Sequence, residues 1–358
     1  MTIIGRLNRY ARRTAPAGYS SARQQQAVRR ILLIQHCFYV AHLFLAFFLA
    51  KELWPLVFSA GEPLPLWPVF WLNEANLRLT AAGIILFLFG GAVGAAMLVQ
   101  ARIFRVAVAI GVLLAAALFN SFGSISHGLH IWFWMAAMFA LFPSVGEDEI
   151  LSSRALRLRV ISIFVATQML VMLFYTLSGL FKLTNGFTYE PGAISSLSLH
   201  ALSVHVSASL FGSQGGTILG DFIIENPWLG WPVFLAVLYF EIFAVYAVFR
   251  PSIQRMWGFF LITFHLGIFV VMGIAFLLQP VQVLLLMAWS PFAVRDTSWR
   301  QLAIDMPVIG VVARELLGPR PAAGDRQKFW AAEMQGLALL IAICAALFFG
   351  RFLYRLIF

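Results

Sequence analysis

The chain has 358 residues, of which 61% are hydrophobic and only 11% are charged, and its mean hydropathy is +0.87. Soluble domains usually carry about 25% charged residues, so this composition excludes a water-soluble globular protein and predicts an all-α, polytopic bundle in a membrane. The net charge of +10 does not indicate nucleic-acid binding, because the basic residues lie in short segments that flank apolar runs.

The first 30 residues contain seven arginines and no acidic residue. A signal peptide would have a shorter basic region and a cleavage site soon after its apolar core. We therefore expect residues 1–30 to form a cytoplasmic arm, part of which lies on anionic lipid, with a transit peptide as the alternative. Cys37 and Cys344 lie within apolar runs and are interpreted as core residues without a disulfide or metal role.

Apolar runs of about 20 residues are long enough to cross a bilayer as helices. Such runs occupy 31–50, 79–100, 103–121, 128–146, 159–182, 228–249 and 332–350. The longer stretch 254–292 is interrupted by Gly273 and Pro280, which predicts two helices joined by a tight turn. The sequence therefore predicts about nine transmembrane helices.

The distribution of arginine and lysine predicts the orientation of these helices. Basic residues gather in the segments 101–105, 147–159, 250–255 and 293–331, whereas they are sparse in 51–78, 122–127 and 183–227. The first group is expected inside and the second outside, with a cytoplasmic N-terminus. The main transmembrane domain would be 31–292, followed by a cytoplasmic segment, 293–331, and a last helix, 332–358. The count of spans places the C-terminus outside, an orientation that Arg351 and Arg355 oppose.

The outer loop 183–227 is the longest of the connecting segments. Apolar residues recur at helical spacing from Ile194 to Phe211, and a second stripe on the same segment is polar: Ser196, His200, Ser203 and Ser207. This pattern predicts a helix that lies at the membrane interface or covers a cavity.

The run 159–182 carries a polar face. Gln168, Tyr175, Gly179 and Lys182 follow one another at spacings of seven, four and three residues, with Ser178 beside them. A helix surrounded by lipid does not need such a face, so we expect it to point into the bundle. Lys182 has two interpretations, an anchor whose ammonium reaches the headgroups or a desolvated base.

Six further ionisable residues, one glutamate and five histidines, lie within or beside the apolar runs. Glu241 has no cation at i±4, so it is expected either to be protonated or to meet a partner on another helix, and a pair with His265 is the structural alternative to a catalytic role. His127 and His130, at i and i+3, could reach one ligand. His36, His42 and Gln168 are expected to make interhelical hydrogen bonds. The sequence has no metal-binding motif.

The segment LFYTLSGLFKLTNGF (Leu173–Phe187) resembles the part of the vitamin K-dependent gamma-carboxylase family that carries its catalytic lysine. NSFGSISHGLHIW (Asn120–Trp132) resembles that family's preceding segment, and YFEIFAVYAV and FFLITFHLGIFVVMGIAF resemble its later helices, in the same order. The resemblance covers roughly residues 30–295, the HTTM-type transmembrane domain that many bacterial proteins have alone.

This resemblance implies a lyase-type carboxylation that uses reduced vitamin K or another hydroquinone and no metal. In that family the lysine deprotonates the hydroquinone, and the strong base formed with oxygen removes a proton from a glutamyl side chain, which takes up carbon dioxide. The lysine corresponds to Lys182, and His127 or His130 would bond the hydroquinone or the intermediate. The cofactor pocket would include Tyr175, Gln168, Ser178, Glu241 and His265.

The carboxylase also has a large outer domain that grips its peptide substrate, and this sequence shows no counterpart. The feature that carries over best is a membrane pocket with an outward mouth for a quinol-like or lipidic molecule. The expected partners are membrane lipids, quinone and a protein or peptide substrate on the outer side, and the expected location is the bacterial inner membrane with the site facing the periplasm. The alternatives are a non-enzymatic protein that binds or transports a quinone, lipid or small solute, and an assembly scaffold.

Overall fold

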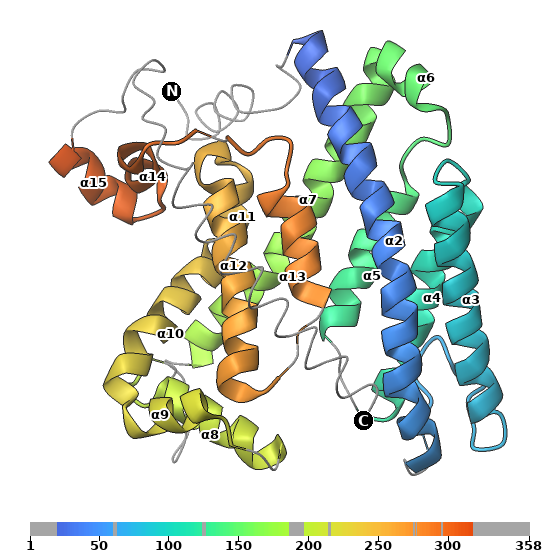
Figure 1. The fold of residues 1–358 in the computed structure, drawn as a ribbon, viewed down its shortest axis with the longest axis horizontal. Helices are drawn as coiled ribbons and strands as arrows, with labels where there is room; N and C mark the ends of the chain where they lie inside the picture. Colours follow the sequence, from blue (N-terminus) through green and yellow to red (C-terminus); the bar gives the residue numbers. More distant parts are fainter. Residues whose placement is uncertain are drawn as a thin grey trace. The chain divides into compact units, whose positions relative to one another are not determined.

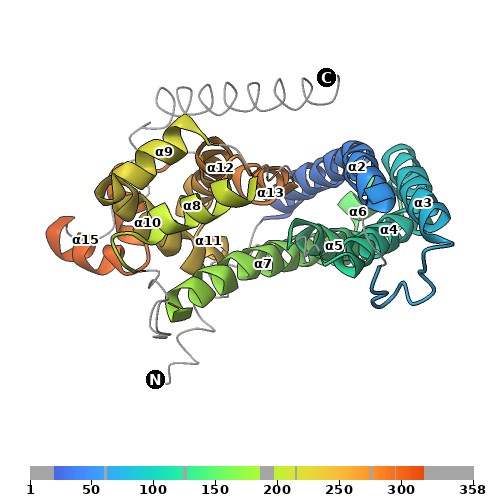
Figure 2. The same cartoon turned by 90° about the horizontal axis from the view of Figure 1, so that it is seen from below.

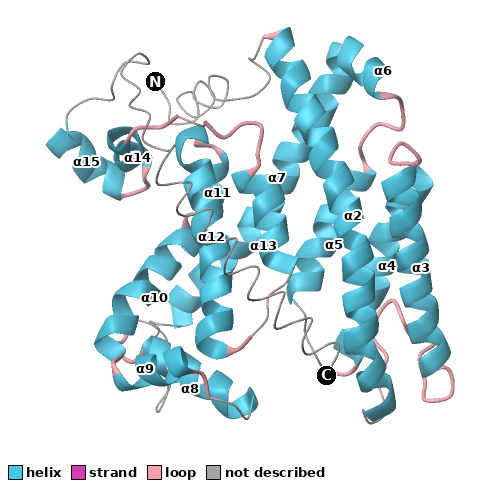
Figure 3. Ribbon diagram, in the orientation of Figure 1, coloured by secondary structure: helices cyan, strands magenta, loops and turns pink. Residues whose placement is uncertain are grey.

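The structure is a computed structural model that describes residues 20–59, 63–123, 127–185, 197–213, 216–274, 276, 278–294 and 296–317. In these residues every regular element is a helix, and no strand is present (Figure 3). The all-α prediction is therefore confirmed. The chain divides into two compact units, the first made of Met1–Val171 with Ser290–Phe292 and the second of Met172–Trp289 with Ala293–Phe358.

Several helices have the length and composition of membrane spans, as expected for an integral membrane protein. Among the described residues there are five such helices, and a sixth span arises if one bent helix pair is counted as a single span. The five are Ser21–Leu53, Leu77–Met97, Arg102–Ser121, Arg154–Thr184 and Pro251–Met272, and the pair, bent by 104°, is Ile218–Glu225 with Pro227–Ile242.

The first unit is built from α2 to α6 and the first half of α7. These helices are α2 (Ser21–Ser59), α3 (Leu77–Met97), α4 (Arg102–Ser121), α5 (His127–Ala140), α6 (Glu147–Ser152) and α7 (Arg154–Asn185). Helices α2, α3, α4 and α5 contact one another in chain order (Figures 1 and 2). A Cβ on Gly91 of α3 would lie 3.2 Å from the Cβ of Ala107 on α4, so a glycine here permits the close helix approach typical of membrane bundles.

An aromatic cluster occupies the core of the first unit. Phe38 of α2 packs against His42, Trp132 and Phe139, with ring centroids 4.3, 5.1 and 5.1 Å away. The indole Nε1 of Trp132 donates a 2.6 Å hydrogen bond to Nε2 of His42, whose Nδ1 lies 2.8 Å from the Phe38 carbonyl. The interhelical hydrogen bond predicted for His42 is thus present, between α2 and α5.

Helix α5 is shorter than the predicted span 128–146. It has 14 residues and ends at Ala140, so at 1.5 Å per residue it is about 21 Å long, less than the roughly 30 Å of a hydrocarbon core. Pro143 follows the helix end, and Arg105 of α4 donates to Ser144 Oγ at 2.7 Å and to the Phe139 carbonyl at 3.5 Å. These contacts hold residues 141–146 outside the helix.

The second unit contains the rest of α7 and the helices that follow. They are α8 (Ala201–Ser213), α9 (Ile218–Glu225), α10 (Pro227–Ile242), α11 (Ala244–Val248), α12 (Pro251–Met272), α13 (Leu278–Val283), the π-helix η2 (Leu284–Ala288), α14 (Trp299–Asp305) and α15 (Ile309–Leu317). Helix α12 contacts α8, α9, α10, α11, α13, η2 and α14, and is therefore the central element of this unit (Figure 1).

The stretch 254–292 contains two helical segments, as the sequence predicts. Helix α12 ends at Met272, and its C-cap residue Gly273 has a φ of 70°, a left-handed conformation that glycine adopts without steric cost. The second segment begins at Leu278 and continues through η2 to Ala288. Pro280 lies inside α13 rather than in the turn.

The predicted connecting segments differ from the structure in two places. Helix α2 begins at Ser21, so the last ten residues of the expected arm 1–30 belong to a helix, while 1–19 lie outside the described residues. The loop 183–227 contains α8, α9 and the end of α7, and Ser203 of the predicted polar stripe donates to the Ile223 carbonyl at 3.0 Å. The last predicted helix, 332–350, lies outside the described residues.

Two arginines that the sequence assigns to cytoplasmic segments are buried in the first unit. Arg105 is 1% exposed and Arg157 is 5% exposed. Arg157 donates to the carbonyls of Leu151 and Ser152 and to Ser21 Oγ, at 2.6, 3.3 and 3.1 Å. Their charges therefore serve contacts within the protein, and they are weaker indicators of orientation than charges in exposed loops.

Candidate functional site

The polar face of α7 in the second unit consists of Tyr175, Gly179 and Lys182. Because these residues follow one another at spacings of four and three, they lie on one side of the helix. Tyr175 and Gly179 are buried and Lys182 is half-buried. Lys182 lies in the last turn of α7, where the helix macrodipole favours a positive charge.

Lys182 forms an ion pair with Glu241 of α10. The ammonium Nζ lies 2.7 Å from Oε1 and 2.6 Å from Oε2 of the carboxylate, and the side chains are 31% and 4% exposed. The partner on another helix that the sequence predicts for Glu241 is therefore Lys182. The ammonium is held within the protein by this carboxylate.

A glycine makes this ion pair geometrically feasible. A Cβ built on Gly179 would lie 2.8 Å from the Cβ of Glu241, 2.8 Å from the backbone nitrogen of Ile242 and 3.0 Å from its Cγ1. Helices α7 and α10 therefore cross in direct backbone contact, one turn before Lys182. The next helix, α11, also contacts α7, since the backbone N–H of Val245 donates to Thr176 Oγ1 at 3.1 Å.

His265 of α12 is paired with Tyr175. The tyrosine hydroxyl lies 2.8 Å from Nε2 of the imidazole, and both side chains are buried. The alternative in which Glu241 pairs with His265 is therefore wrong, because each residue has another partner. Nδ1 of His265 is buried and makes no hydrogen bond with any residue that the structure describes.

Aromatic rings connect the two pairs. The ammonium of Lys182 lies 5.9 Å from the ring centroid of Phe264, the residue that precedes His265, and this distance is within the range of a cation–π contact. The ring of Phe276 is 5.5 Å from that of His265. The Lys182–Glu241 and Tyr175–His265 pairs thus form one cluster, the paired site, bordered by phenylalanine rings.

His205 of α8 lies near the paired site. Its ring centroid is 5.6 Å from that of Phe234 on α10. Desolvation and the positive charge of Lys182 both lower the pKa of His205. The imidazole is therefore expected to be neutral at neutral pH, so that it can accept a hydrogen bond.

Two other predicted pocket residues on α7 have different surroundings. Gln168 belongs to the first unit, where its Nε2 donates to Ser290 Oγ at 3.1 Å. Ser290 follows the end of η2 and is not in a helix, so this bond is not the interhelical bond that the sequence predicts for Gln168. Ser178 is half-buried beside Gly179.

The two histidines of α5 belong to the first unit. Nε2 of His130 lies 3.2 Å from Nδ2 of Asn120 on α4, and the ring is half-buried. The side chain of His127, the first residue of α5, lies outside the described residues. No group of three or more metal-binding side chains occurs in the part of the chain that the structure describes.

Sequence reasoning identified most members of the paired site but not their partners. Two neighbours of the site, His205 and Phe264, were missed because nothing in their local spacing distinguishes them from ordinary helix residues. The Lys182–Glu241 pair had a signal, since each is a lone charge beside or within an apolar run, and isolated charges in a membrane bundle tend to pair with one another.

The paired site can bind and move a proton. It contains a cation, an anion, a phenol and an imidazole on three helices, with the imidazole of His205 nearby on α8, and its borders are apolar and aromatic. A scan against protein-family models finds no match to the chain, and searches of curated proteins and of solved structures find none either.

Proposed function

We propose that the paired site binds a reduced quinone and that Lys182 acts on it as a general base, as in the vitamin K-dependent gamma-carboxylase family that the sequence resembles. The observation that supports this proposal is the contact of Lys182 Nζ with both oxygens of Glu241, at 2.7 and 2.6 Å. An ammonium becomes a base only after it gives up its own proton. Glu241 is the contacting group that can take that proton.

The dry surroundings favour this exchange. Glu241 is 4% exposed at its side chain, and a separated charge in such a place is costly. When the proton moves from Lys182 to Glu241, an ion pair becomes a neutral amine and a neutral acid, so the net charge of the pair does not change. The amine can then accept a proton from a ligand hydroxyl within hydrogen-bond reach.

The residues present fit an aromatic ligand that carries hydroxyl groups. The rings of Phe264 and Phe276 supply apolar faces, and Nδ1 of His265 is a buried polar atom that a ligand hydroxyl could pair with. Tyr175 holds the His265 ring through Nε2. When bound, a reduced quinone would react with oxygen to give a strong base. That base would remove a proton from the substrate, which is the step that precedes carboxylation or a related reaction.

The membrane arrangement that accompanies this function has nine spans and a cytoplasmic N-terminus. It counts the shorter apolar helices α5 and α13 with η2, together with residues 332–350. The paired site would face the periplasmic side of a bacterial inner membrane, where a protein or peptide could approach. Labelling of single cysteines placed at Thr184 and Ser153, in a chain without Cys37 and Cys344, tests this, since only position 184 should react from outside.

The decisive experiment incubates the purified full chain in liposomes with reduced vitamin K, oxygen, labelled carbon dioxide and a glutamyl peptide. Mass spectrometry should detect quinone epoxide, and Lys182→Ala should lower its rate by about 10²- to 10⁴-fold. Lys51→Ala in α2 is the matched control and should keep the rate. Equal epoxide formation by Lys182→Ala would disprove the role of this lysine. Quinol that is bound but recovered unchanged would favour the non-enzymatic alternative, a protein that binds or transports a quinone or lipid.

A further inference from the structure

The last described helix, α15, exposes an apolar face. Ile309, Val312 and Leu316 follow one another at spacings of three and four residues, so they lie on one side of the helix, and they are 48%, 59% and 79% exposed. The opposite side includes the small buried residues Gly310 and Ala313. A row of exposed apolar side chains of this kind marks a surface that contacts a protein or a membrane.

Helix α15 is fixed to the rest of the second unit, so its apolar face keeps one direction. A Cβ on Gly310 would overlap a backbone carbonyl of α14, because α14 and α15 pack in direct backbone contact there. The Tyr239 hydroxyl of α10 donates to the Pro307 carbonyl, between α14 and α15, at 2.6 Å. Ser252 of α12 donates to the carboxylate of Asp305, the last residue of α14.

These contacts place α14 and α15 at one end of a helix that has the length and composition of a membrane span. Ser252 lies in the first turn of α12, which has 22 residues and is therefore about 33 Å long, close to the roughly 30 Å of a hydrocarbon core. At its other end, Thr217, the N-cap residue of α9, donates to the Val271 carbonyl at 2.6 Å. Helices α14 and α15 thus lie at the end of α12 opposite to α9 (Figure 1), and the end of a span is the depth of the lipid headgroups.

The segments at the two ends of α12 differ in charge. The segments 250–255 and 293–331, which contain the first turn of α12 and helices α14 and α15, have eight arginines and lysines and four acidic residues. The segment 183–227, which contains α8 and α9, has three acidic residues and no arginine or lysine. Anionic lipid attracts basic segments next to a span, so the charge near α15 complements a negative membrane surface.

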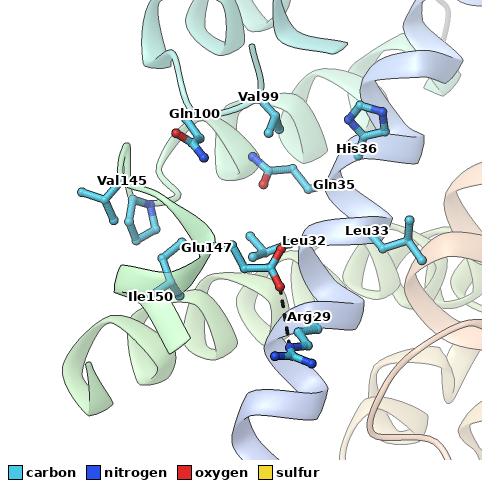
Figure 4. A pocket seen from close by; sticks show the side chains of 11 residues that line it. Arg29, Leu32, Leu33, Gln35, His36, Val99, Gln100, Val145, Glu147 and Ile150 are labelled. Atoms are coloured by element: carbon cyan, nitrogen blue, oxygen red, sulfur yellow. Dashed lines mark ion pairs between the residues drawn. The ribbon is translucent and has the colours of Figure 1, made fainter. Parts of the chain in front are cut away.

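The cavity in the first unit does not show such a difference in charge. It has a volume of about 270 Å³, and Arg29 of α2 and Glu147 of α6, which line it, face each other at 3.7 Å (Figure 4). These opposite charges compensate each other within the protein.

We propose that α15 lies in the plane of the membrane interface and binds anionic lipid. Ile309, Val312 and Leu316 enter the acyl-chain region and Arg314 contacts the headgroup phosphates, which is the arrangement of an interfacial amphipathic helix. Trp299 of α14, which is 61% exposed, is a residue type that is enriched at this depth. The inference depends neither on the paired site nor on the function proposed for it.

Fluorescence quenching in liposomes tests the depth of α15. In the full chain without Cys37 and Cys344, Val312→Cys carries a bimane label on the apolar face. Asp296→Cys, at an exposed position in the loop before α14, is the matched control. Brominated acyl chains should quench the label at 312 at least about threefold more strongly than the label at 296. Leu316→Cys takes the place of Val312→Cys if that variant fails to fold.

Native mass spectrometry with phosphatidylglycerol and phosphatidylcholine tests the charge of the lipid. Arg314→Gln should lower the affinity for phosphatidylglycerol about fivefold and leave that for phosphatidylcholine unchanged, and Glu315→Gln, which removes the only acid of α15, should raise the former. Equal quenching at 312 and 296, or unchanged phosphatidylglycerol affinity in Arg314→Gln, would overturn the proposal. Disulfide-linked dimers formed through position 312 would also overturn it, since they assign the apolar face to a second copy of the chain.

Discussion

Gly179 of α7 lies against Glu241 of α10 so closely that a Cβ at position 179 would be 2.8 Å from the Cβ of the glutamate. This approach brings the end of α7 to α10, where the Lys182 ammonium contacts the Glu241 carboxylate at 2.6 Å. The ion pair between Lys182 and Glu241 thus depends on the close approach of the two helices that Gly179 permits.

Gly179→Ala should separate α7 from α10. Because the added methyl group would meet backbone as well as a side chain, we expect a loss of about 1–3 kcal/mol in the free energy of unfolding, measured in mixed micelles. Gly267→Ala in α12 is the control, since a Cβ there meets nothing within 4 Å. A helical alanine should raise stability by up to about 1 kcal/mol at that position. Equal effects at the two sites would contradict the close contact.

Lys182→Met should leave Glu241 buried without its cation. Breaking a buried ion pair costs about 3–5 kcal/mol, and we expect the low end of this range because the Lys182 side chain is 31% exposed. The double variant Lys182→Met/Glu241→Leu should be more stable than Lys182→Met, since no unpaired charge remains. Additive losses in a double-mutant cycle would show that the two side chains do not interact.

Tyr175→Phe should remove the hydrogen bond to His265 while keeping the ring. A buried imidazole nitrogen without a partner costs about 1–3 kcal/mol, which thermal unfolding can detect. Tyr239→Phe, which loses a 2.6 Å bond to the Pro307 carbonyl, is the comparison. Both variants should lose stability, but only Tyr175→Phe should weaken quinol binding. If Tyr239→Phe has the same effect on binding, then binding depends on stability alone.

Acid should destabilise the second unit partly through His205. Desolvation and Lys182 lower the pKa of His205 in the folded protein, so the unfolded chain, with a pKa of about 6.5, binds the proton more readily. Stability should therefore fall as the pH drops below about 6.5. His205→Gln should lose less thermal stability than the wild-type chain between pH 7.5 and 5.5. Identical pH profiles would show that His205 does not contribute.

Much of the paired site could be predicted from spacing. Tyr175, Gly179 and Lys182 lie on one helix, where the period of 3.6 residues determines which side chains share a face. Partners on other helices follow no such local rule. Glu241 could have met His265 or Lys182 on sequence grounds, and only the crossing at Gly179 selects Lys182.

The lengths of the helices were less predictable than their existence. Composition identifies apolar runs, but the end of α5 at Ala140 depends on Arg105 of α4, which bonds the Phe139 carbonyl and Ser144. The same arginine shows why charge counting is incomplete. An arginine counted as a loop charge can be buried by residues distant in sequence.

By itself, the sequence determined that this is an all-helical membrane protein and that Lys182 and Glu241 are unusual charges, because hydropathy and helical period are properties of neighbouring residues. Only the tertiary structure decided that these charges pair with each other and that Tyr175 holds His265. Pairing and burial arise from contacts between helices, and those contacts depend on how closely backbones approach at a few small residues such as Gly179.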